Sequence, residues 1–319
     1  MSDKFTPPQP LNTAVLFLVF NRLDTTKQVF DAIKQAKPPR LYIAADGARI
    51  DKEGEAEKVT EVRNFIMQNI DWKCNIKTLF RDKNLGCKYA VSGAIDWFFE
   101  SEEMGIILED DCLPDQSFFW FCEELLLRYK SDTRISSISG CNPFRYDGIE
   151  QSNDSYFFSK YSQIWGWASW RRAWDNYDVE MTVWPKVKRL NGHHVFFESN
   201  RETRHFESIF DKCYQGKIDT WDFQWFFTKS LIMSLTIISN RNLVKNIGEG
   251  EDATHTSTLP NEISRHPLFE ISFPIIHPEN IIVDYRRDRY TMKYRFHRNF
   301  FTKLAYFSKI KLKKYFKTI

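Results

Sequence analysis

The chain has 319 residues, and 45 Lys and Arg against 42 Asp and Glu give it a formal net charge of +3. A content of 42% hydrophobic and 27% charged residues excludes a disordered chain and suits one large domain or two small ones. The charge is uneven: residues 286–319 hold twelve Lys and Arg and one acid, which leaves 33 basic and 41 acidic side chains in residues 1–285. An acidic body excludes a nucleic-acid-binding surface across the whole domain.

The N-terminal segment and the cysteines indicate a cytoplasmic protein. Residues 1–10 are polar and Pro-rich, without the basic start and apolar stretch of a secretory signal. The apolar run 14–20 is too short to span a bilayer. Because the six cysteines lack the close paired spacing of a zinc site, we interpret them as reduced thiols.

The first half of the chain alternates apolar runs of strand length with segments of helix length. Strands are expected at 14–20, 41–45, 75–80 and 104–108, and helices after Asp24, near 55–69 and from Asn84 to about Glu100. This alternation predicts βαβ units and an α/β fold with a central, mostly parallel sheet.

Beyond about Gly140 the regular alternation fades. Helices are expected at 201–215 and from Thr220, a strand pair near 237–244, a polar loop at 246–256 and irregular structure at 257–285.

Polar residues directly follow three of the expected strands. Asn21 and Arg22 come after the first strand, Asp46 after the second, and the acidic triplet 109–111 after the fourth. Since ligands of parallel sheets bind beyond the carboxyl ends of the strands, these residues are the candidate site.

The acidic triplet consists of Glu109, Asp110 and Asp111. Carboxylates this close repel one another, and a divalent cation relieves the repulsion while it also holds phosphate oxygens. Mg²⁺ or Mn²⁺ suits such oxygen ligands. A solvated turn, or a cap for the helix expected from Ser117, fits the same residues equally well.

The strand 106–108 followed by this triplet resembles the metal-binding DXD motif of GT-A nucleotide-sugar glycosyltransferases. In particular it is similar to the Glu-Asp-Asp variant of the N-acetylglucosaminyltransferase I and protein O-mannose N-acetylglucosaminyltransferase types. The resemblance covers much of residues 14–256 and implies a GT-A (Rossmann-like) fold. It implies the following roles: Asn21, Arg22 and Asp46 in the nucleotide pocket, Asp110 at the ribose, Glu109 at the sugar and Asp111 on the metal.

Three later segments resemble the same family in the same order. The family carries an aromatic, Gly-containing segment near the sugar and acceptor, a Trp-Asp element with the catalytic base, and a Gly-rich turn that leads to a His. The matching residues here are Trp165, Gly166 and Trp167 for the first segment, Trp221 and Asp222 for the second, and Gly248 to His255 for the third. The resemblance implies that Asp222 is the base and that His255 binds the metal or the diphosphate.

The residues themselves leave alternatives open. An apolar surround increases a carboxylate's proton affinity and suits a general base, but Asp222 fits a helix N-terminus as well. A lone His such as His255 is more often a loop or core residue than a ligand, and buried Trp is common. Lys88 lies in a helix start that suits either the nucleotide or an ordinary cap. Fallback bases are Asp219, Glu249, Glu251 and Asp252.

The basic tail 286–319 mixes aromatic with cationic residues. As a helix, 301–319 gathers Leu304, Leu312 and Phe316 towards one side and Lys309 and Lys313 on another. This pattern is typical of an interfacial helix drawn to anionic lipid. A helix packed on the body, or an arm that binds an acidic neighbour, fits the same pattern.

Together these features predict a GT-A glycosyltransferase domain at 1–285, with a nucleotide-binding half at about 12–140 and an acceptor half at about 141–285, and a membrane-touching tail at 286–319. We expect an inverting enzyme that uses Mn²⁺ or Mg²⁺ and a nucleoside-diphosphate sugar, UDP-sugar being favoured. The acceptor would be a saccharide or a lipid-linked sugar, in bacterial surface-polysaccharide synthesis. The alternatives are a sugar-nucleotide nucleotidylyltransferase, which normally has a Gly-rich basic loop where this chain has Asn21 and Arg22, and a non-catalytic carbohydrate- or lipid-binding protein.

Overall fold

The computed structural model describes residues 5–144, 146, 149, 152–248 and 267–293. Its first half follows the predicted alternation of strands and helices. In chain order the elements are β1 (Val15–Val19), α1 (Leu23–Ala36), β2 (Arg40–Ala45), α2 (Glu55–Asn69), β3 (Asn75–Phe80), α3 (Gly86–Ser101) and β4 (Met104–Glu109). The apolar runs therefore placed these strands to within about two residues.

These four strands form the parallel half of an eight-stranded mixed sheet with the order β3-β2-β1-β4-β8-β6-β9-β7. Strand β1 lies between β2 and β4 and is parallel to both. The chain thus moves outward from β1 to β2 and β3 and then returns to the other side of β1. Ligands of open α/β sheets bind at such a reversal of strand order, and here it brings the ends of β1 and β4 together.

The second half completes the sheet with strands of both directions. Its elements are β5 (Cys112–Pro114), α4 (Ser117–Arg128), β6 (Ile135–Ser139), β7 (Tyr156–Ser159), β8 (Trp167–Trp170), α5 (Arg171–Trp174), α6 (Trp184–Arg189), the 3₁₀ helix η1 (Gly192–Val195), α7 (Asn200–Tyr214), α8 (Asp222–Leu231), β9 (Leu235–Ser239) and β10 (Val244–Asn246). The helix expected at 201–215 is confirmed.

The prediction that strands near 237–244 pair with each other is wrong. Strand β9 pairs with β6 and β7 inside the large sheet, whereas β10 pairs with β5 in a separate antiparallel ribbon. The ribbon runs beside the acidic triplet, because β5 starts directly after Asp111.

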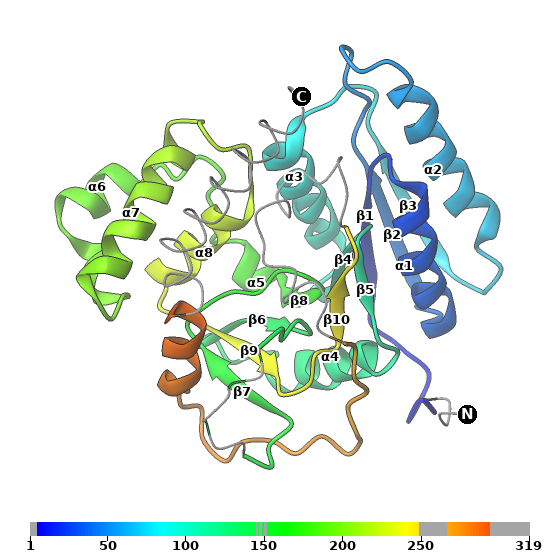
Figure 1. Cartoon of the computed structure of the whole chain (residues 1–319). Helices are drawn as coiled ribbons and strands as arrows, with labels where there is room; N and C mark the ends of the chain where they lie inside the picture. Colours follow the sequence, from blue (N-terminus) through cyan, green and yellow to red (C-terminus); the bar gives the residue numbers. More distant parts are fainter. Residues whose placement is uncertain (1–4, 145, 147–148, 150–151, 249–266, 294–319) are drawn as a thin grey trace, which may run out of the picture.

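Helices cover both faces of the sheet (Figure 1). Val15, Phe17 and Val19 of β1 pack with α1, α2 and α4, while Leu16 and Leu18 pack with α3 and a group of tryptophans on the other face. Burial on both faces explains why β1 is an uninterrupted apolar run.

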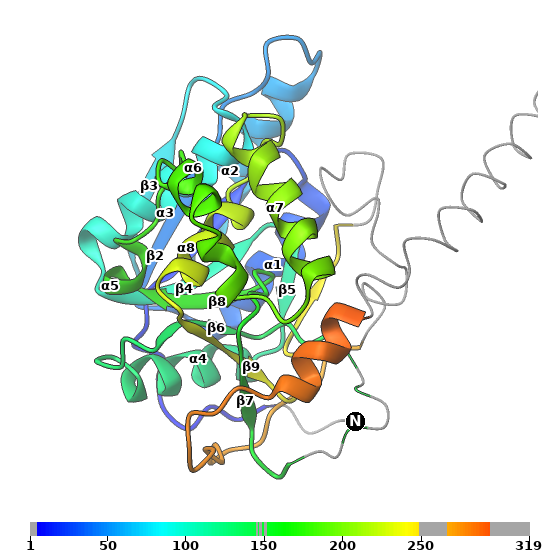
Figure 2. The ribbon, with the colours of Figure 1, turned by 90° about the vertical axis from the view of Figure 1, so that its left-hand side faces the viewer.

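The predicted boundary between body and tail is placed too early. Residues 285–293 form a helix that lies beside β7 (Figure 2). Arg287 and Asp288 are each only 2% exposed, and Met292 belongs to a core cluster. Asp288 accepts hydrogen bonds from the Ser159 hydroxyl and the Lys160 N–H. The body therefore extends at least to residue 293, because charges buried and paired in this way are part of a fold and not of a free tail.

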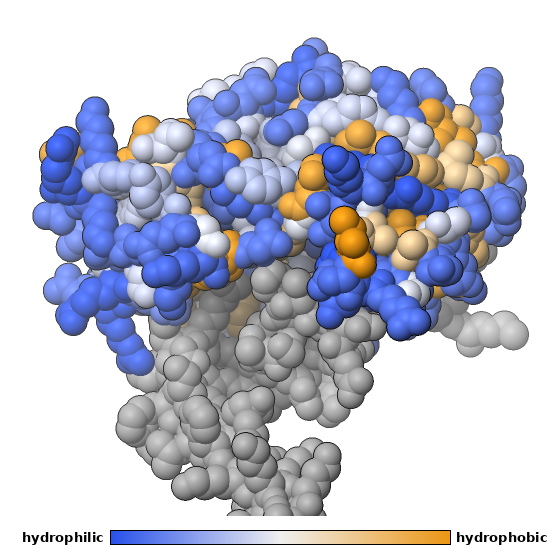
Figure 3. Space-filling model, turned by 90° about the horizontal axis from the view of Figure 1, so that it is seen from above, coloured by the Kyte–Doolittle hydropathy of each residue, from blue (hydrophilic) through white to orange (hydrophobic). Residues whose placement is uncertain are grey.

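The described surface that faces the viewer from above is largely hydrophilic, with apolar residues in small separate groups (Figure 3). Within the described ranges, no helix combines the length and the apolar character needed to cross a bilayer.

Candidate functional site

The acidic triplet is paired with Arg22, which follows β1. The Arg22 guanidinium forms ion pairs with Asp110 and, at 3.0 Å, with Asp111. Burial lowers the pKa of Arg22, but the two carboxylates outweigh burial and raise it above its ordinary value. Arg22 is 88 positions from Asp110 and 89 from Asp111 in the sequence, and these ion pairs link the loop after β1 to the loop after β4.

The triplet nevertheless holds more negative charge than Arg22 neutralises. Burial raises the pKa of Asp110, with Arg22 opposing the rise. Burial also raises the pKa of Glu109, and the neighbouring charges of Asp111, Asp110 and Asp222 add to the rise. Asp222 therefore lies close enough to interact electrostatically with Glu109, although 113 positions separate the two residues in the sequence.

Whether the triplet suits a divalent cation depends on its free oxygen atoms. Asp110 is 4% exposed, and its Oδ2 is buried without a hydrogen-bond partner. An orphaned buried carboxylate oxygen is costly unless a donor or a cation reaches it. The carboxylate oxygens of the triplet are therefore suitable ligands for Mg²⁺ or Mn²⁺.

The set is not a complete metal cage. Across the described part of the chain, no group of three or more His, Cys, Asp or Glu side chains could hold a metal ion. Gly248, which follows β10, passes so close that a Cβ there would lie 2.3 Å from Asp111 Oδ2. Any side chain at this position would therefore displace the Asp111 carboxylate or the Arg22 guanidinium. Gly248 is the start of the predicted Gly-rich turn. His255, Glu249, Glu251 and Asp252 lie outside the described residues.

Asn21 belongs to a network that the sequence did not reveal. Its Nδ2 donates to Glu55 Oε1 at 2.9 Å, and Glu55 also accepts the Arg49 N–H at 2.8 Å. Hydrogen bonds from Arg49 lower the pKa of Glu55 despite its burial. Glu55 is thus an ionised anchor that holds the loop after β2 against the end of β1.

Two carboxylates occupy the N-terminus of α3. Asp46 accepts the N–H groups of Leu85 at 3.0 Å and Gly86 at 3.1 Å, and Asp219 accepts those of Cys87 at 3.0 Å and Lys88 at 2.8 Å. These carboxylates fill the place where the helix end would hold a phosphate. Asp46 and Asp219 therefore act here as helix caps, and Asp219 is not a free base.

Lys88, in the first turn of α3, forms an ion pair within the protein. Its ammonium is paired with Glu180 at 2.9 Å and the residue is 8% exposed. In this structure Lys88 ties α3 to the segment before α6, so a donor phosphate would have to compete with Glu180 for it.

Asp222 is the first residue of α8. Its Oδ1 accepts hydrogen bonds from the Thr220 hydroxyl and, at 2.9 Å, from the Phe223 N–H. Its Oδ2 has no hydrogen-bond partner among the residues that the structure describes, and the residue is half-buried. The two hydrogen bonds to Oδ1 therefore fix the orientation of the carboxylate.

The aromatic predictions are corrected in part. Trp167 and Trp221 are 1% and 2% exposed, and their rings stack on each other with centroids 5.6 Å apart. They belong to the core beneath the site, and rings buried this completely present no face to a sugar. Trp165 is half-buried and packs at the edge of the core, and Gly166, with a φ of 64°, packs against Val244 of β10.

Replacing Trp167 with Ala is expected to lower the free energy of unfolding by about 3–5 kcal/mol, the usual result of removing a buried Trp. Urea unfolding of the purified variants measures this loss. Trp165→Ala is the matched control and should cost less than half as much, because Trp165 is half-buried. Unchanged stability in Trp167→Ala together with weaker sugar binding would instead restore the role predicted from the sequence.

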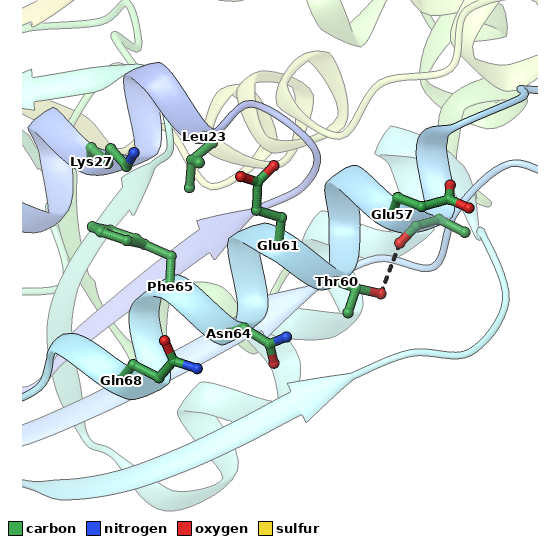
Figure 4. Close-up of a pocket in the computed structure, with 9 residues that line it drawn as sticks. Leu23, Lys27, Glu57, Thr60, Glu61, Asn64, Phe65 and Gln68 are labelled. Atoms are coloured by element: carbon green, nitrogen blue, oxygen red, sulfur yellow. Dashed lines mark hydrogen bonds between the residues drawn. The ribbon is translucent and has the colours of Figure 1, made fainter.

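A hollow of about 640 Å³ between α1 and α2 shares none of the predicted site residues (Figure 4). Lys27, Glu57, Glu61 and Phe65 line it from exposed helix faces, and its charges are mixed in sign. We therefore place the candidate site at the carboxylates and not in this hollow.

No protein-family model matches the chain, and no curated protein matches it. Among solved structures, HddC from Yersinia pseudotuberculosis is 11% identical, with a TM-score of 0.31 over 50% of this chain and 77% of that one. The galactosyltransferase LgtC, in complex with donor and acceptor sugar analogues, is 13% identical, with a TM-score of 0.32 over 60% of this chain and 68% of that one. Residues 1–349 of S. aureus TarS are 9% identical, with a TM-score of 0.38 over 73% of this chain and 60% of that one.

Proposed function

We propose that the protein is a GT-A-type glycosyltransferase that moves a sugar from a nucleoside-diphosphate sugar, UDP-sugar being favoured, to a hydroxyl group of a saccharide or lipid-linked acceptor. One observation carries the proposal: the acidic triplet lies at the reversal of strand order with Arg22 on one side and Asp222 within electrostatic reach of Glu109. A cationic group and a separate carboxylate that flank such a cluster suit an anionic leaving group and a proton acceptor.

On the donor side, Asp111 and the unpartnered Oδ2 of Asp110 would hold Mg²⁺ or Mn²⁺, with the remaining ligands from the diphosphate, water or the predicted His255. The bound metal supplies positive charge that stabilises the leaving diphosphate. Arg22 is the second cation of the site, and it holds both aspartates in place before a donor arrives. Asn21, with its amide fixed by Glu55, borders the same edge.

On the acceptor side, Asp222 would act as the general base. The acceptor oxygen attacks the anomeric carbon, the bond from that carbon to the diphosphate oxygen breaks, and the acceptor proton passes to Asp222. A single displacement of this kind inverts the anomeric configuration. The hydrogen bonds from Thr220 and Phe223 to Oδ1 orient the carboxylate, so that Oδ2 can take the proton.

The proposed donor is tested by incubating the protein with a panel of nucleotide-sugars, with Mn²⁺ or with a chelator, and measuring release of the nucleoside diphosphate. Metal-dependent release from one donor class supports the proposal. A protein that neither binds nor hydrolyses any nucleotide-sugar would contradict the proposal and favour the alternative of a non-catalytic carbohydrate- or lipid-binding protein.

We also propose that residues 294–319 attach the protein to an anionic membrane surface. This segment contains eight Lys and Arg and no Asp or Glu, interleaved with aromatic residues. Polybasic aromatic segments bind anionic lipid through both charge and apolar contact.

Deleting 294–319 should release the protein from vesicles that contain phosphatidylglycerol, as measured by co-sedimentation. The deletion begins at 294 because Arg287 and Asp288 are buried in the body. Vesicles of neutral lipid are the control and should bind neither form. Equal binding of the full chain and the truncated chain would contradict the proposal.

A further inference from the structure

The N-terminus of α3 joins two parts of the chain that are far apart in sequence. One carboxylate oxygen of Asp219 accepts a hydrogen bond from the Lys88 N–H and the other accepts one from the Cys87 N–H. These partners lie 131 and 132 positions away in the sequence. Gly86 allows this contact: its φ is +77°, and a Cβ there would lie 2.7 Å from Asp219 Oδ2. Any larger residue at position 86 would push the Asp219 carboxylate away.

Asp219 and Asp222 stand at the two ends of one short segment. Between them, Trp221 stacks on Trp167 of β8, and its backbone C=O accepts the Tyr177 hydroxyl at 3.1 Å. Thr220 is 4% exposed and donates to the Asp222 carboxylate. The segment is therefore fixed at its centre by packing and at its start by the carboxylate of Asp219.

We propose that Asp219 is a positioning residue: it ties the segment that carries Asp222 to the start of α3 and so sets the place of Asp222 relative to the acidic triplet. The inference rests on the proposed function and deepens it. Asp219 does not take part in proton transfer itself, because both of its oxygens accept backbone N–H groups.

Loss of the Asp219 contact should lower the rate of transfer strongly and should affect the affinity for the donor much less. Displacing a catalytic group by about 1 Å can cost roughly 10²-fold in rate. We expect Asp219→Ala to lower kcat by about that factor. The donor KM and the Mn²⁺-dependent affinity for UDP should change little, because the proposed donor-binding residues Arg22 and Asp111 lie in the loops after β1 and β4 and not in the segment that Asp219 anchors.

Gly86→Ala is the second variant and keeps the Asp219 carboxylate. It should reproduce the loss of kcat, because the new Cβ would displace Asp219. In both variants the Cys87 and Lys88 amides should exchange with solvent faster than in the wild type. Ser199→Ala is the matched control: it removes the cap of α7, a hydrogen bond to the Glu202 N–H, and should leave kcat unchanged.

The outcomes separate the two proposals. Transfer activity in the wild type with unchanged kcat in Asp219→Ala and Gly86→Ala overturns the positioning role alone. A rise in donor KM at constant kcat also overturns it, because Asp219 would then act on donor binding. Absence of transfer in the wild type with every donor overturns the proposed function, and the positioning role falls with it.

Discussion

Replacing Asp222 with Asn is expected to lower kcat by roughly 10²–10⁴-fold, the usual contribution of a general base. The amide is nearly the same size and can still accept the Phe223 N–H through its oxygen, so the fold should be retained. It cannot take a proton from the acceptor hydroxyl. Donor KM should change little, because Asp222 lies on α8, whereas the proposed donor-binding groups are Arg22 and the acidic triplet.

The measurement is steady-state kinetics with saturating donor and varied acceptor. Asp96→Asn is the control: Asp96 is an exposed aspartate of α3 that accepts the Trp174 indole N–H, and its replacement should leave kcat near the wild-type value. If Asp222→Asn keeps more than about a tenth of the wild-type kcat, the base is another residue, and Glu109, which interacts electrostatically with Asp222, is the first carboxylate to examine.

Replacing Asp111 with Asn is expected to abolish the metal dependence of donor binding and to lower transfer by about 10³-fold. The metal's stabilisation of the leaving group is worth several kcal/mol, and each step of about 1.36 kcal/mol corresponds to a tenfold change in rate. The variant also loses an ion pair with Arg22, whereas the pair between Arg22 and Asp110 remains.

Mn²⁺ binding can be followed directly by electron paramagnetic resonance, in the presence of UDP, without any turnover. We expect Asp111→Asn to bind Mn²⁺ much more weakly than the wild type. Asp115→Asn is the control: Asp115 accepts the Ser117 N–H at the start of α4, and its replacement should leave the Mn²⁺ affinity unchanged. Full transfer activity in Asp111→Asn with Mn²⁺ present would show that the metal assignment is wrong.

The sequence predicted the parallel half of the sheet well because each of its strands is a local pattern. The run that became β1 is apolar throughout since both of its faces are covered, and the polar residues after β1, β2 and β4 mark the strand ends. The strand β8 could not be predicted in the same way. It inserts antiparallel between β4 and β6, and the pairing of Ile107 with Trp167 depends on contacts 60 positions apart.

The grouping of the candidate residues at one edge of the sheet was predicted in outline, but their pairings were not. The sequence indicated that Arg22 and the triplet would lie at one edge, and the structure shows that they pair with each other. Trp167 illustrates the opposite case, because a Trp beside a glycine suits a sugar site but also suits a core, where its large apolar ring is commonly buried. Nothing local to Asp219 indicated that its partners are backbone N–H groups of α3.

The tail boundary shows how a charge count can mislead. Twelve basic residues in 286–319 suggested a free cationic segment. Arg287, however, is buried, with its guanidinium over the Phe157 ring at 4.3 Å and hydrogen-bonded to Asn240. A long cationic side chain can pack on aromatic faces inside a fold, and composition alone does not distinguish this from solvent exposure.

The central claim, a metal-dependent nucleotide-sugar site at the acidic triplet, is tested most directly by isothermal titration calorimetry of the full chain with UDP and UDP-sugars. The titration is performed once with Mn²⁺ and once with the metal chelated. We predict binding with Mn²⁺ that weakens at least about tenfold when the metal is removed. Equal affinity in both conditions, or no binding of any nucleotide-sugar with Mn²⁺ present, would contradict the account.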